Sequence, residues 1–284
     1  MAVAPEDLDP PLNPDYWRLV GVDIDGTLMH WGGEISDSVI EAIERVRLSR
    51  NHIVLATGRN IMATMPVAQT LGLRRGWAVT SNGAVTVRLN PAAPGGYEIV
   101  RTVTFNPRAA LELIRDEMPD AFFAVEDLGV GFRVTKHFPM GELVGSQTVV
   151  DFESLCSEEV TRVVIRAPGA DVAHFDDIVG RIGLNDVTYA VGYSAWLDLT
   201  PPGVSKASAL EFVREELGVE PAHTVAVGDG NNDIEMLRWA HDSYAMGNAP
   251  DKVIAAAGAR VEPVDEDGVL EVLVPLIDPR RLAM

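Results

Sequence analysis

Two aspartates, Asp23 and Asp25, directly follow the short apolar run 19–22 and directly precede Gly26. Side chains alternate across an extended strand, so both carboxylates are expected to point to one side at the strand's carboxyl end. Carboxylates placed in this way repel each other, and a hard divalent cation with oxygen ligands, Mg2+, would relieve the repulsion. Gly26 permits the sharp turn with which the chain would leave the strand. A solvated acidic turn uses the same residues, so this pattern alone does not decide between the two.

A second acidic cluster, Asp229-Gly230-Asn231-Asn232-Asp233, follows another apolar run. Its D-x-N-x-D spacing could begin an EF-hand calcium loop. Ile234 stands where that loop needs a glycine, and Ala240 stands where it needs the terminal glutamate. The calcium-loop interpretation therefore fails, and the cluster remains a set of acids at the end of a predicted strand.

Lys206 is one of only three lysines among the 23 basic residues; the others are Lys136 and Lys252. It stands at the predicted start of a helix, where a cation is mildly unfavourable to the helix dipole. A compact ammonium kept at such a position, in a chain that otherwise uses arginine, favours a functional role. An ordinary surface lysine is the alternative.

The elements that must position these residues alternate between strands and helices in the first and last thirds of the chain. Apolar runs predict strands at 19–22, 52–56, 77–80, 224–227 and 243–246. Helical patterns lie between them, beginning near Ser36 or Ser38 and covering 63–71, 205–217 and 234–240. Near-continuous apolar strands that alternate with helices predict a parallel sheet covered by helices on both faces.

The middle third of the chain has a different pattern. Strands are predicted at 122–126, 131–135, 160–166 and 187–191, around a helix at 172–182. Hairpins mixed with helices predict an α+β module with an antiparallel sheet. We therefore expect a flexible N-terminal tail at 1–16, a core formed by 17–83 and 197–284, and an inserted domain at 84–196.

The strands predicted for the core end in polar or small residues. Ligands of an open parallel sheet bind outside the carboxyl ends of its strands, and Gly-rich turns and helix starts there offer N–H groups to anions. Acids, hydroxyls and N–H donors gathered at one edge are suited to a phosphate held with a metal ion. The residues concerned are Asp23, Asp25, Thr57, Ser81, Asn82 and Asp229.

Composition excludes several classes of protein. The formal net charge of −19 argues against a protein that binds the nucleic-acid backbone. The single cysteine, Cys156, excludes an internal disulfide. No apolar run approaches the roughly 18 residues of a membrane span, and the first sixteen residues lack the features of a signal peptide. We expect a cytoplasmic protein without a nucleic-acid or membrane partner.

Several motifs taken together resemble the haloacid dehalogenase superfamily, and more closely its Cof-type phosphatase branch. They appear in the family's order and extend from Asp23 to Val269. Two departures are that Ala207 stands where glycine is usual, and that the loop after Leu28 carries Met29-His30-Trp31. The motifs are Asp23-Ile24-Asp25-Gly26-Thr27-Leu28, Thr57-Gly58-Arg59, Ser81-Asn82-Gly83-Ala84, Gly203-Val204-Ser205-Lys206, Gly228-Asp229-Gly230-Asn231-Asn232-Asp233, Met246-Gly247-Asn248-Ala249 and Asp267-Gly268-Val269.

This resemblance implies an α/β fold with a Rossmann-like parallel-sheet core and an inserted α+β cap domain that closes over the site. It implies a Mg2+-dependent phosphatase that hydrolyses small phosphomonoesters, sugar phosphates among them, through an aspartyl-phosphate. Asp23 would be the nucleophile and Asp25 the general acid and base, while Thr57 and Lys206 would bind the transferring phosphoryl group.

The resemblance also implies the remaining site residues. Mg2+ would be held by the Asp23 carboxylate, the Asp25 backbone carbonyl and Asp229. The residues expected to bind the substrate phosphate are Ile24, Thr57, Gly58, Lys206 and Asn232. The residues expected to support the site are Arg59, Asn82 and Asp233.

Two other functions keep the same residues: a phosphosugar mutase or phosphotransferase, and a non-catalytic ligand sensor. The expected partner is a small phosphorylated metabolite, and the chain is expected to be a monomer or a homodimer. Specificity should come from the cap, with His30 and Trp31 as further candidates near the leaving group. A structural role, in the core or at the surface, is an equal alternative for each cap residue considered for substrate contact. These residues are Glu126, Arg133, His137, Tyr193 and Trp196.

Overall fold

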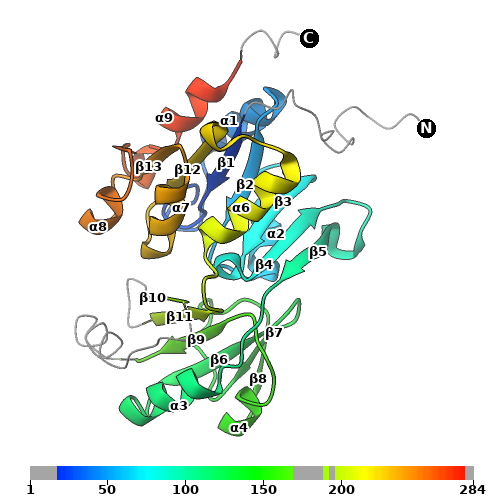
Figure 1. The fold of residues 1–284 in the computed structure, drawn as a ribbon, viewed down its shortest axis with the longest axis vertical. Helices are drawn as coiled ribbons and strands as arrows, with labels where there is room; N and C mark the ends of the chain where they lie inside the picture. Colours follow the sequence, from blue (N-terminus) through cyan, green and yellow to red (C-terminus); the bar gives the residue numbers. More distant parts are fainter. Residues whose placement is uncertain (1–17, 169–187, 192–195, 279–284) are drawn as a thin grey trace.

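The structure is a computed structural model that describes residues 18–168, 188–191 and 196–278. The predicted tail, the predicted helix 172–182 and Tyr193 lie outside the described residues. The described chain forms two sheets, which Figure 1 shows one above the other. Within the described residues, no helix is both long and apolar enough to cross a membrane.

The larger sheet has eight strands, and β1 (Leu19–Val22) lies at its centre between β12 (Thr224–Gly228) and β2 (His52–Ala56). The six strands from β14 to β3 run parallel, and β4 and β5 extend the sheet in antiparallel fashion. The other strands, in sheet order, are β14 (Ala259–Arg260) and β13 (Asp242–Ala245) on one side and β3 (Gly76–Thr80), β4 (Val85–Leu89) and β5 (Tyr97–Thr102) on the other.

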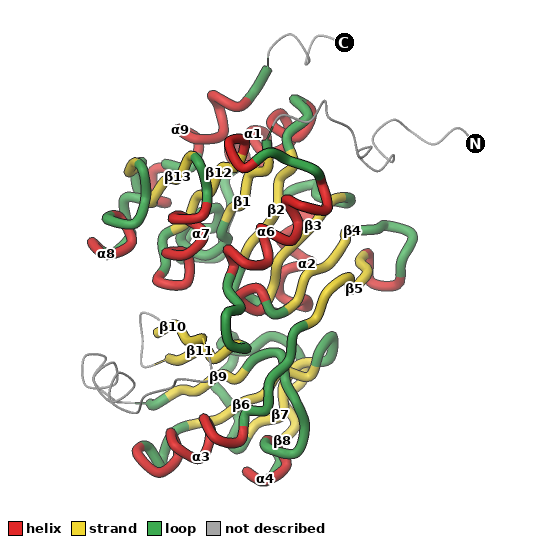
Figure 2. Tube along the Cα trace, in the orientation of Figure 1, coloured by secondary structure: helices red, strands yellow, loops and turns green. Residues whose placement is uncertain are grey.

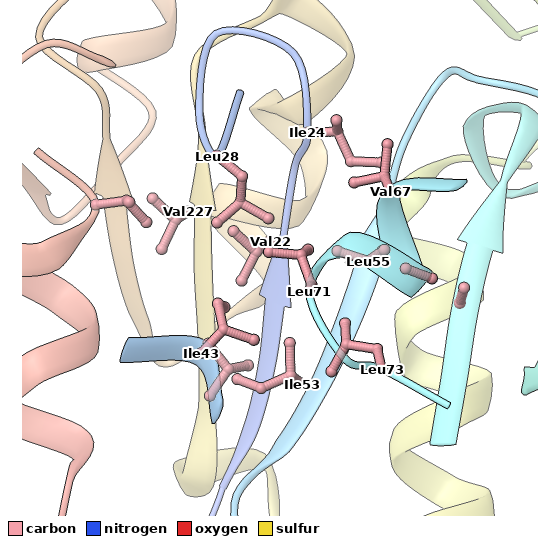
Figure 3. Packing of buried hydrophobic residues seen from close by; sticks show 14 of the residues in the cluster. Val22, Ile24, Leu28, Ile43, Ile53, Leu55, Val67, Leu71, Leu73 and Val227 are labelled. Atoms are coloured by element: carbon pink, nitrogen blue, oxygen red, sulfur yellow. The ribbon is translucent and has the colours of Figure 1, made fainter. Parts of the chain in front are cut away.

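Helices cover both faces of this sheet (Figure 2). Alternate side chains of each strand point to opposite faces, and the apolar side chains on both faces pack against helices. Val20 and Val22 of β1 pack with α1 (Asp37–Leu48), α2 (Ile61–Thr70) and α9 (Leu270–Leu273), and Figure 3 shows part of this cluster. Leu19 packs on the other face with α6 (Lys206–Leu217), α7 (Ile234–Trp239) and α8 (Asp251–Ile254). Short 3-10 turns occupy Ser81–Gly83, Pro94–Gly96, Pro221–His223, Asn231–Asp233, Val264–Glu266 and Val274–Leu276.

The smaller sheet has six strands and carries a buried apolar cluster on each face, the larger of them on the face towards α3 (Arg108–Glu117) and α4 (Phe152–Leu155). Ala110, Leu111 and Ile114 of α3 and Leu155 of α4 pack with this face. Its strands pair in antiparallel fashion except for β7 and β8, which run parallel. In sheet order they are β10 (Thr188–Val191), β11 (Trp196–Thr200), β9 (Val163–Arg166), β6 (Phe122–Asp127), β7 (Gly131–Val134) and β8 (Ser146–Val149).

The structure corrects the predicted limits of the inserted domain. β4 and β5 follow β3 in hairpin succession and pair into the larger sheet, so residues 84–102 do not belong to the smaller one. β11 belongs to the smaller sheet as far as Thr200, beyond the predicted limit at 196. The sheet of the inserted domain is antiparallel, as predicted, except that β8 pairs in parallel with β7 after a longer connection.

Other local predictions are confirmed. β2 covers the residues predicted for it, and Ser36 caps α1. Ser205 caps α6, and the helix ends at Gly218 in the left-handed conformation that glycine adopts readily. The first residue of α6 is Lys206, so this cap fixes where the lysine enters the fold.

Leu210 gives a test of how α6 is held against the sheet. It is fully buried, and its side chain fills the space above Gly21 in β1, where an added Cβ would lie 2.8 Å from Leu210 Cδ1. We expect Leu210→Ala to lower the free energy of unfolding by ~2–5 kcal/mol, because it leaves a cavity in the core. Denaturant unfolding measures this, with the exposed Glu216→Ala of the same helix as control. An equal loss in both variants would contradict the packing described.

Candidate active site

A cavity of about 450 Å³ lies between the carboxyl ends of the central parallel strands and the smaller sheet. Its lining therefore comes from both sheets. The larger sheet and its loops contribute Asp23, Asp25, Trp31, Gly58, Arg59, Asn60, Ala63, Asp229, Gly230, Asn231 and Asn232. The smaller sheet and its loops contribute Phe132, Gly141, Glu142, Leu143, Val144, Arg162 and Asp198.

Neighbouring parallel strands bring the two acidic motifs together. Val22 of β1 lies opposite Val227 of β12, and the Asp23 backbone N–H continues this pairing by donating to the Val227 carbonyl at 3.0 Å. Asp23 and Asp229 thus follow adjacent strands at the same edge of the sheet. Asp23, Asp229 and Asp233 are buried, and each offers a carboxylate oxygen within 4.8 Å of the others.

Lys206 is fully buried among these acids, so the surface-lysine alternative was wrong. Its Nζ donates to Asp23 Oδ1 and to Asp233 Oδ1, both at 2.6 Å. Burial by itself would lower the pKa of Lys206, but the two carboxylates raise it above its usual range. The ammonium therefore stays charged and fixes Asp23 relative to Asp233.

The pKa of Asp23 lies well above its usual range. Burial is the largest cause, and the carboxylates of Asp233, Asp229 and Asp25 act in the same direction against the opposing effect of Lys206. Three buried carboxylates share one ammonium, which leaves an excess of negative charge in a site poor in solvent. This is the electrostatic demand that a divalent cation meets.

The hydrogen bonds indicate which oxygens suit a cation. Asp233 is occupied, since Oδ1 accepts from Lys206 and Oδ2 accepts from the backbone N–H groups of Asp229 and Gly230. Asp23 Oδ2 accepts no hydrogen bond from the described residues. Two side chains orient the Asp229 carboxylate: Thr27 Oγ1 donates to Oδ1 at 3.3 Å, and Asn248 Nδ2, whose role sequence reasoning missed, donates to Oδ2 at 3.1 Å. Asp23 and Asp229 thus fit a hard cation, with Asp233 holding the loop behind them.

Two glycines make this close packing sterically feasible. Gly26 has φ +77°, and a Cβ there would lie 2.3 Å from Asp229 Oδ2. A Cβ on Gly228 would lie 2.4 Å from Asp233 Cγ, so only glycine lets Asp233 fold back against the strand end. Both positions therefore place backbone against a carboxylate, which a larger residue would displace.

Asp25 lies apart from the acidic cluster and forms a bidentate ion pair with Arg59. Arg59 Nε donates to Asp25 Oδ2 at 2.8 Å, and Nη2 donates to Oδ1 at 2.5 Å. This hydrogen bonding raises the pKa of Arg59 above its usual range. The Asp25 side chain is 49% exposed, and both residues line the cavity. Asp25 therefore presents an accessible carboxyl group whose orientation Arg59 fixes.

Of the remaining predicted residues, Gly58 and Asn232 line the cavity. Thr57 is buried, and its Oγ1 accepts from the Arg59 backbone N–H at 3.1 Å. Asn232 Nδ2 donates to Asn82 Oδ1 at 2.9 Å, next to Gly58. Asn82 Nδ2 is buried without a partner among the described residues. The side chain of Ile24 packs in the core (Figure 3), which leaves only its backbone for a ligand.

Four of the five candidates in the inserted domain do not line the cavity, and the fifth, Tyr193, lies outside the described residues. Arg133 binds Asp127 instead of lining the cavity, Trp196 packs against Phe138, and His137 is exposed away from the lining. Glu126 binds Ser81 at 2.7 Å and does not line the cavity. Arg162 and Asp198 line it instead. The alternation in Leu197-Asp198-Leu199, with apolar residues on either side of an acid, was the signal available for Asp198.

The loop after Leu28 contains two candidate residues, and one of them lines the cavity. Trp31 lines the cavity. His30 points elsewhere and contacts Asp267 Oδ1 at 3.1 Å from Nε2, which ties this loop to the Asp267-Gly268-Val269 motif.

Comparison with protein families gives a match over nearly the whole described chain. The sequence profile of the haloacid dehalogenase-like hydrolases matches residues 20–273. The 5-amino-6-(5-phospho-D-ribitylamino)uracil phosphatase YitU of Bacillus subtilis is 26% identical over 268 residues, which cover 90% of this chain and 96% of YitU. A phosphoglycolate phosphatase of Halorubrum lacusprofundi is 29% identical over 257 residues, covering 90% of this chain and 96% of the relative.

Solved structures share the fold. The phosphatase BT1666 of Bacteroides thetaiotaomicron superposes with a TM-score of 0.74 at 25% identity, covering 94% of this chain and 97% of BT1666. The subclass IIB sugar phosphatase BT4131 superposes with a TM-score of 0.76 at 24% identity, covering 91% and 98% of the two chains. Both likenesses therefore extend over most of this chain and of the solved structure.

The raised pKa of Asp23 predicts that the ionised carboxylate destabilises the metal-free protein. An acid with a raised folded-state pKa loses stability as pH rises from its unfolded pKa of about 4 towards the folded value. We expect Asp23→Asn, which mimics the neutral acid, to unfold at a higher temperature than the unaltered protein in EDTA near neutral pH. Circular dichroism measures this, and the difference should shrink as pH falls to about 4.

Asp127→Asn is the matched control, because Asp127 pairs with Arg133 outside the acidic cluster. A lower unfolding temperature for Asp23→Asn under these conditions would contradict the charge balance described. Added Mg2+ should stabilise the unaltered protein more than Asp23→Asn, since the variant lacks one proposed ligand.

Proposed function

The chain belongs to the haloacid dehalogenase-like hydrolases, in the Cof-type branch that its motifs predicted, and we propose that it hydrolyses small phosphomonoesters with a bound divalent cation. Its curated relatives include phosphatases for a phosphorylated ribityl compound and for phosphoglycolate, and a structural neighbour is a sugar phosphatase. The observation that carries the proposal is the buried Lys206 ammonium that fixes Asp23 beside Asp229 at the floor of the cavity.

Asp23 is the proposed nucleophile. A carboxylate oxygen of Asp23 attacks phosphorus while the bond from phosphorus to the leaving oxygen breaks, and Lys206 holds the side chain in place through Oδ1. The product is an acyl phosphate on Asp23. Water then attacks this phosphorus, inorganic phosphate leaves, and the Asp23 carboxylate is restored. A covalent intermediate divides one difficult displacement into two easier ones.

Asp25 is the proposed proton carrier for both steps. It gives a proton to the leaving oxygen in the first step and takes one from the attacking water in the second. Its exposed carboxylate and its place in the cavity lining allow it to reach both groups. Arg59 orients it through the bidentate pair, so Arg59 is a positioning residue in this scheme.

The transferring phosphoryl group carries negative charge on its equatorial oxygens. Catalysis of phosphoryl transfer therefore depends on positioned positive charge and hydrogen-bond donors. Thr57, Gly58, Asn232 and the Ile24 backbone are the proposed donors. The unpartnered Asn82 Nδ2 beside Asn232 is consistent with an anion at this place. Mg2+ is the proposed cation, held by Asp23, Asp229 and the Asp25 backbone carbonyl, and it would supply charge to the phosphoryl oxygens. Lys206 supplies fixed charge from beneath Asp23.

Phosphate release from a panel of sugar phosphates and other phosphomonoesters tests the reaction. We expect release that requires Mg2+, that stops with EDTA, and that falls by at least ~1,000-fold in Asp23→Asn, since the nucleophile is lost. Asp127→Asn should keep the activity, because its ion pair lies outside the cavity. Transfer to an added sugar phosphate without phosphate release would favour a mutase, and binding without either reaction would favour a sensor.

The metal assignment has its own test. We expect Asp229→Asn to raise the Mg2+ concentration that gives half-maximal activity by ~10–100-fold, because it weakens a ligand. Asp25→Asn should lower the rate at every Mg2+ concentration and leave that midpoint near its original value, since only its backbone carbonyl is a proposed ligand. Identical midpoints for Asp229→Asn and the unaltered protein would exclude Asp229 as a ligand.

A further inference from the structure

We propose that Asp198, positioned by Arg162, binds hydroxyl groups of the substrate's leaving group and selects against a leaving group that carries a second negative charge. The proposal rests on the phosphatase function proposed above and extends it to a substrate class: phosphate esters of sugars or polyols without a second anionic group.

The alternation of the smaller sheet places this pair on the face towards the cavity. Leu197 and Leu199 of β11 and Val163 of β9 belong to the apolar cluster under α3. Asp198 and Arg162 are one residue removed from them and therefore point to the opposite face. Both line the cavity, whose other wall contains Asp23 and Asp229.

The two side chains form a built site. The Arg162 side chain is 7% exposed and that of Asp198 is 14% exposed. Arg162 Nε donates to Asp198 Oδ1 at 2.8 Å, and Nη2 lies 2.6 Å from the same oxygen. Both contacts use one carboxylate oxygen, so Asp198 Oδ2 has no partner among the described residues. An acceptor oxygen is thereby held in place.

The charges of the cavity lining decide what this oxygen can bind. Two arginines, Arg59 and Arg162, line the cavity in the described chain, and each is neutralised by an aspartate. Glu142 lines the same wall as Asp198 and is paired with Arg166. No described lining residue of this wall offers an unpaired positive charge. A carboxylate or second phosphate of a substrate would therefore meet acceptors and no unpaired cation on this wall, which is unfavourable.

A hydroxyl group, unlike an anionic group, suits the wall that contains Asp198. It donates to a carboxylate oxygen in a charge-assisted hydrogen bond, which is stronger than a bond between neutral groups. A sugar or polyol brings several such donors on a neutral framework. The wall of the cavity therefore complements a hydroxylated leaving group, while the opposite wall takes the phosphate.

Sorbitol 6-phosphate and 6-phosphogluconate make a matched pair of probes, because they differ only in a terminal CH2OH against a carboxylate. We expect the unaltered protein to prefer sorbitol 6-phosphate by at least ~10-fold in kcat/KM. Asp198→Ala removes the acceptor and frees Arg162. It should lower kcat/KM for sorbitol 6-phosphate by ~10–100-fold, mainly through KM, and reverse the preference towards 6-phosphogluconate. Hydrolysis of p-nitrophenyl phosphate, which offers no hydroxyl group, should change by less than ~3-fold.

Asp198→Asn keeps the shape of the side chain and replaces the alanine variant in these assays if that variant does not fold. It should weaken the preference for sorbitol 6-phosphate without abolishing binding. Asp127→Ala removes a comparable Arg–Asp pair of the same sheet outside the cavity and should leave the preference unchanged. An unaltered preference in both Asp198 variants, or an equal loss on all three substrates, would overturn the proposal. Absence of phosphate release from every substrate, p-nitrophenyl phosphate included, would instead contradict the phosphatase function. Calorimetric binding of the two matched probes would then still decide the subsite.

Discussion

The site depends on one buried ammonium. Lys206 has no access to solvent, so its charge is tolerable only because Asp23 and Asp233 accept its hydrogen bonds. Those two acids come from loops after different strands, and the lysine comes from the start of α6. The position of each element is therefore constrained by the same ion pairs. The Ser205 cap and the Leu210 contact with β1 place the helix so that this geometry is reached.

The same constraint explains how the site divides its tasks between acids. Asp23 is buried, carries a raised pKa and is fixed from below, whereas Asp25, two residues later, is exposed and held by an arginine. Asp233 uses both oxygens within the protein and can only support its neighbours. Similar side chains thus acquire different chemistry from burial and hydrogen bonding alone. The spacing of residues in the sequence could not supply that distinction.

Much of the larger sheet could be predicted because its strands are apolar on both faces and end in recognisable polar turns. The adjacency of Asp23 and Asp229, implied by the family resemblance, is confirmed by the pairing of β1 with β12. The predicted limits of the inserted domain differ from the structure because a hairpin such as β3–β4 has the same local sequence pattern whichever sheet it joins. The roles of Arg162 and Asp198 were missed because they depend on which face of a short strand meets the cavity. That is decided by long-range packing, here the apolar cluster under α3.

The described chain passes between the two sheets at only two places, near Val103 after β5 and at 201–204 before α6. The acidic cluster and the Arg162–Asp198 pair consequently stand on separately packed sheets that share few covalent connections. Substitutions of cavity-facing residues in or next to β9 and β11 can alter one wall of the cavity and leave the ion pairs of Lys206 unchanged. Such a layout lets selection, or a protein engineer, change the accepted ligand in small steps while the reacting groups stay intact. The stability of the buried charges and the diversity of the opposite wall can then evolve largely independently.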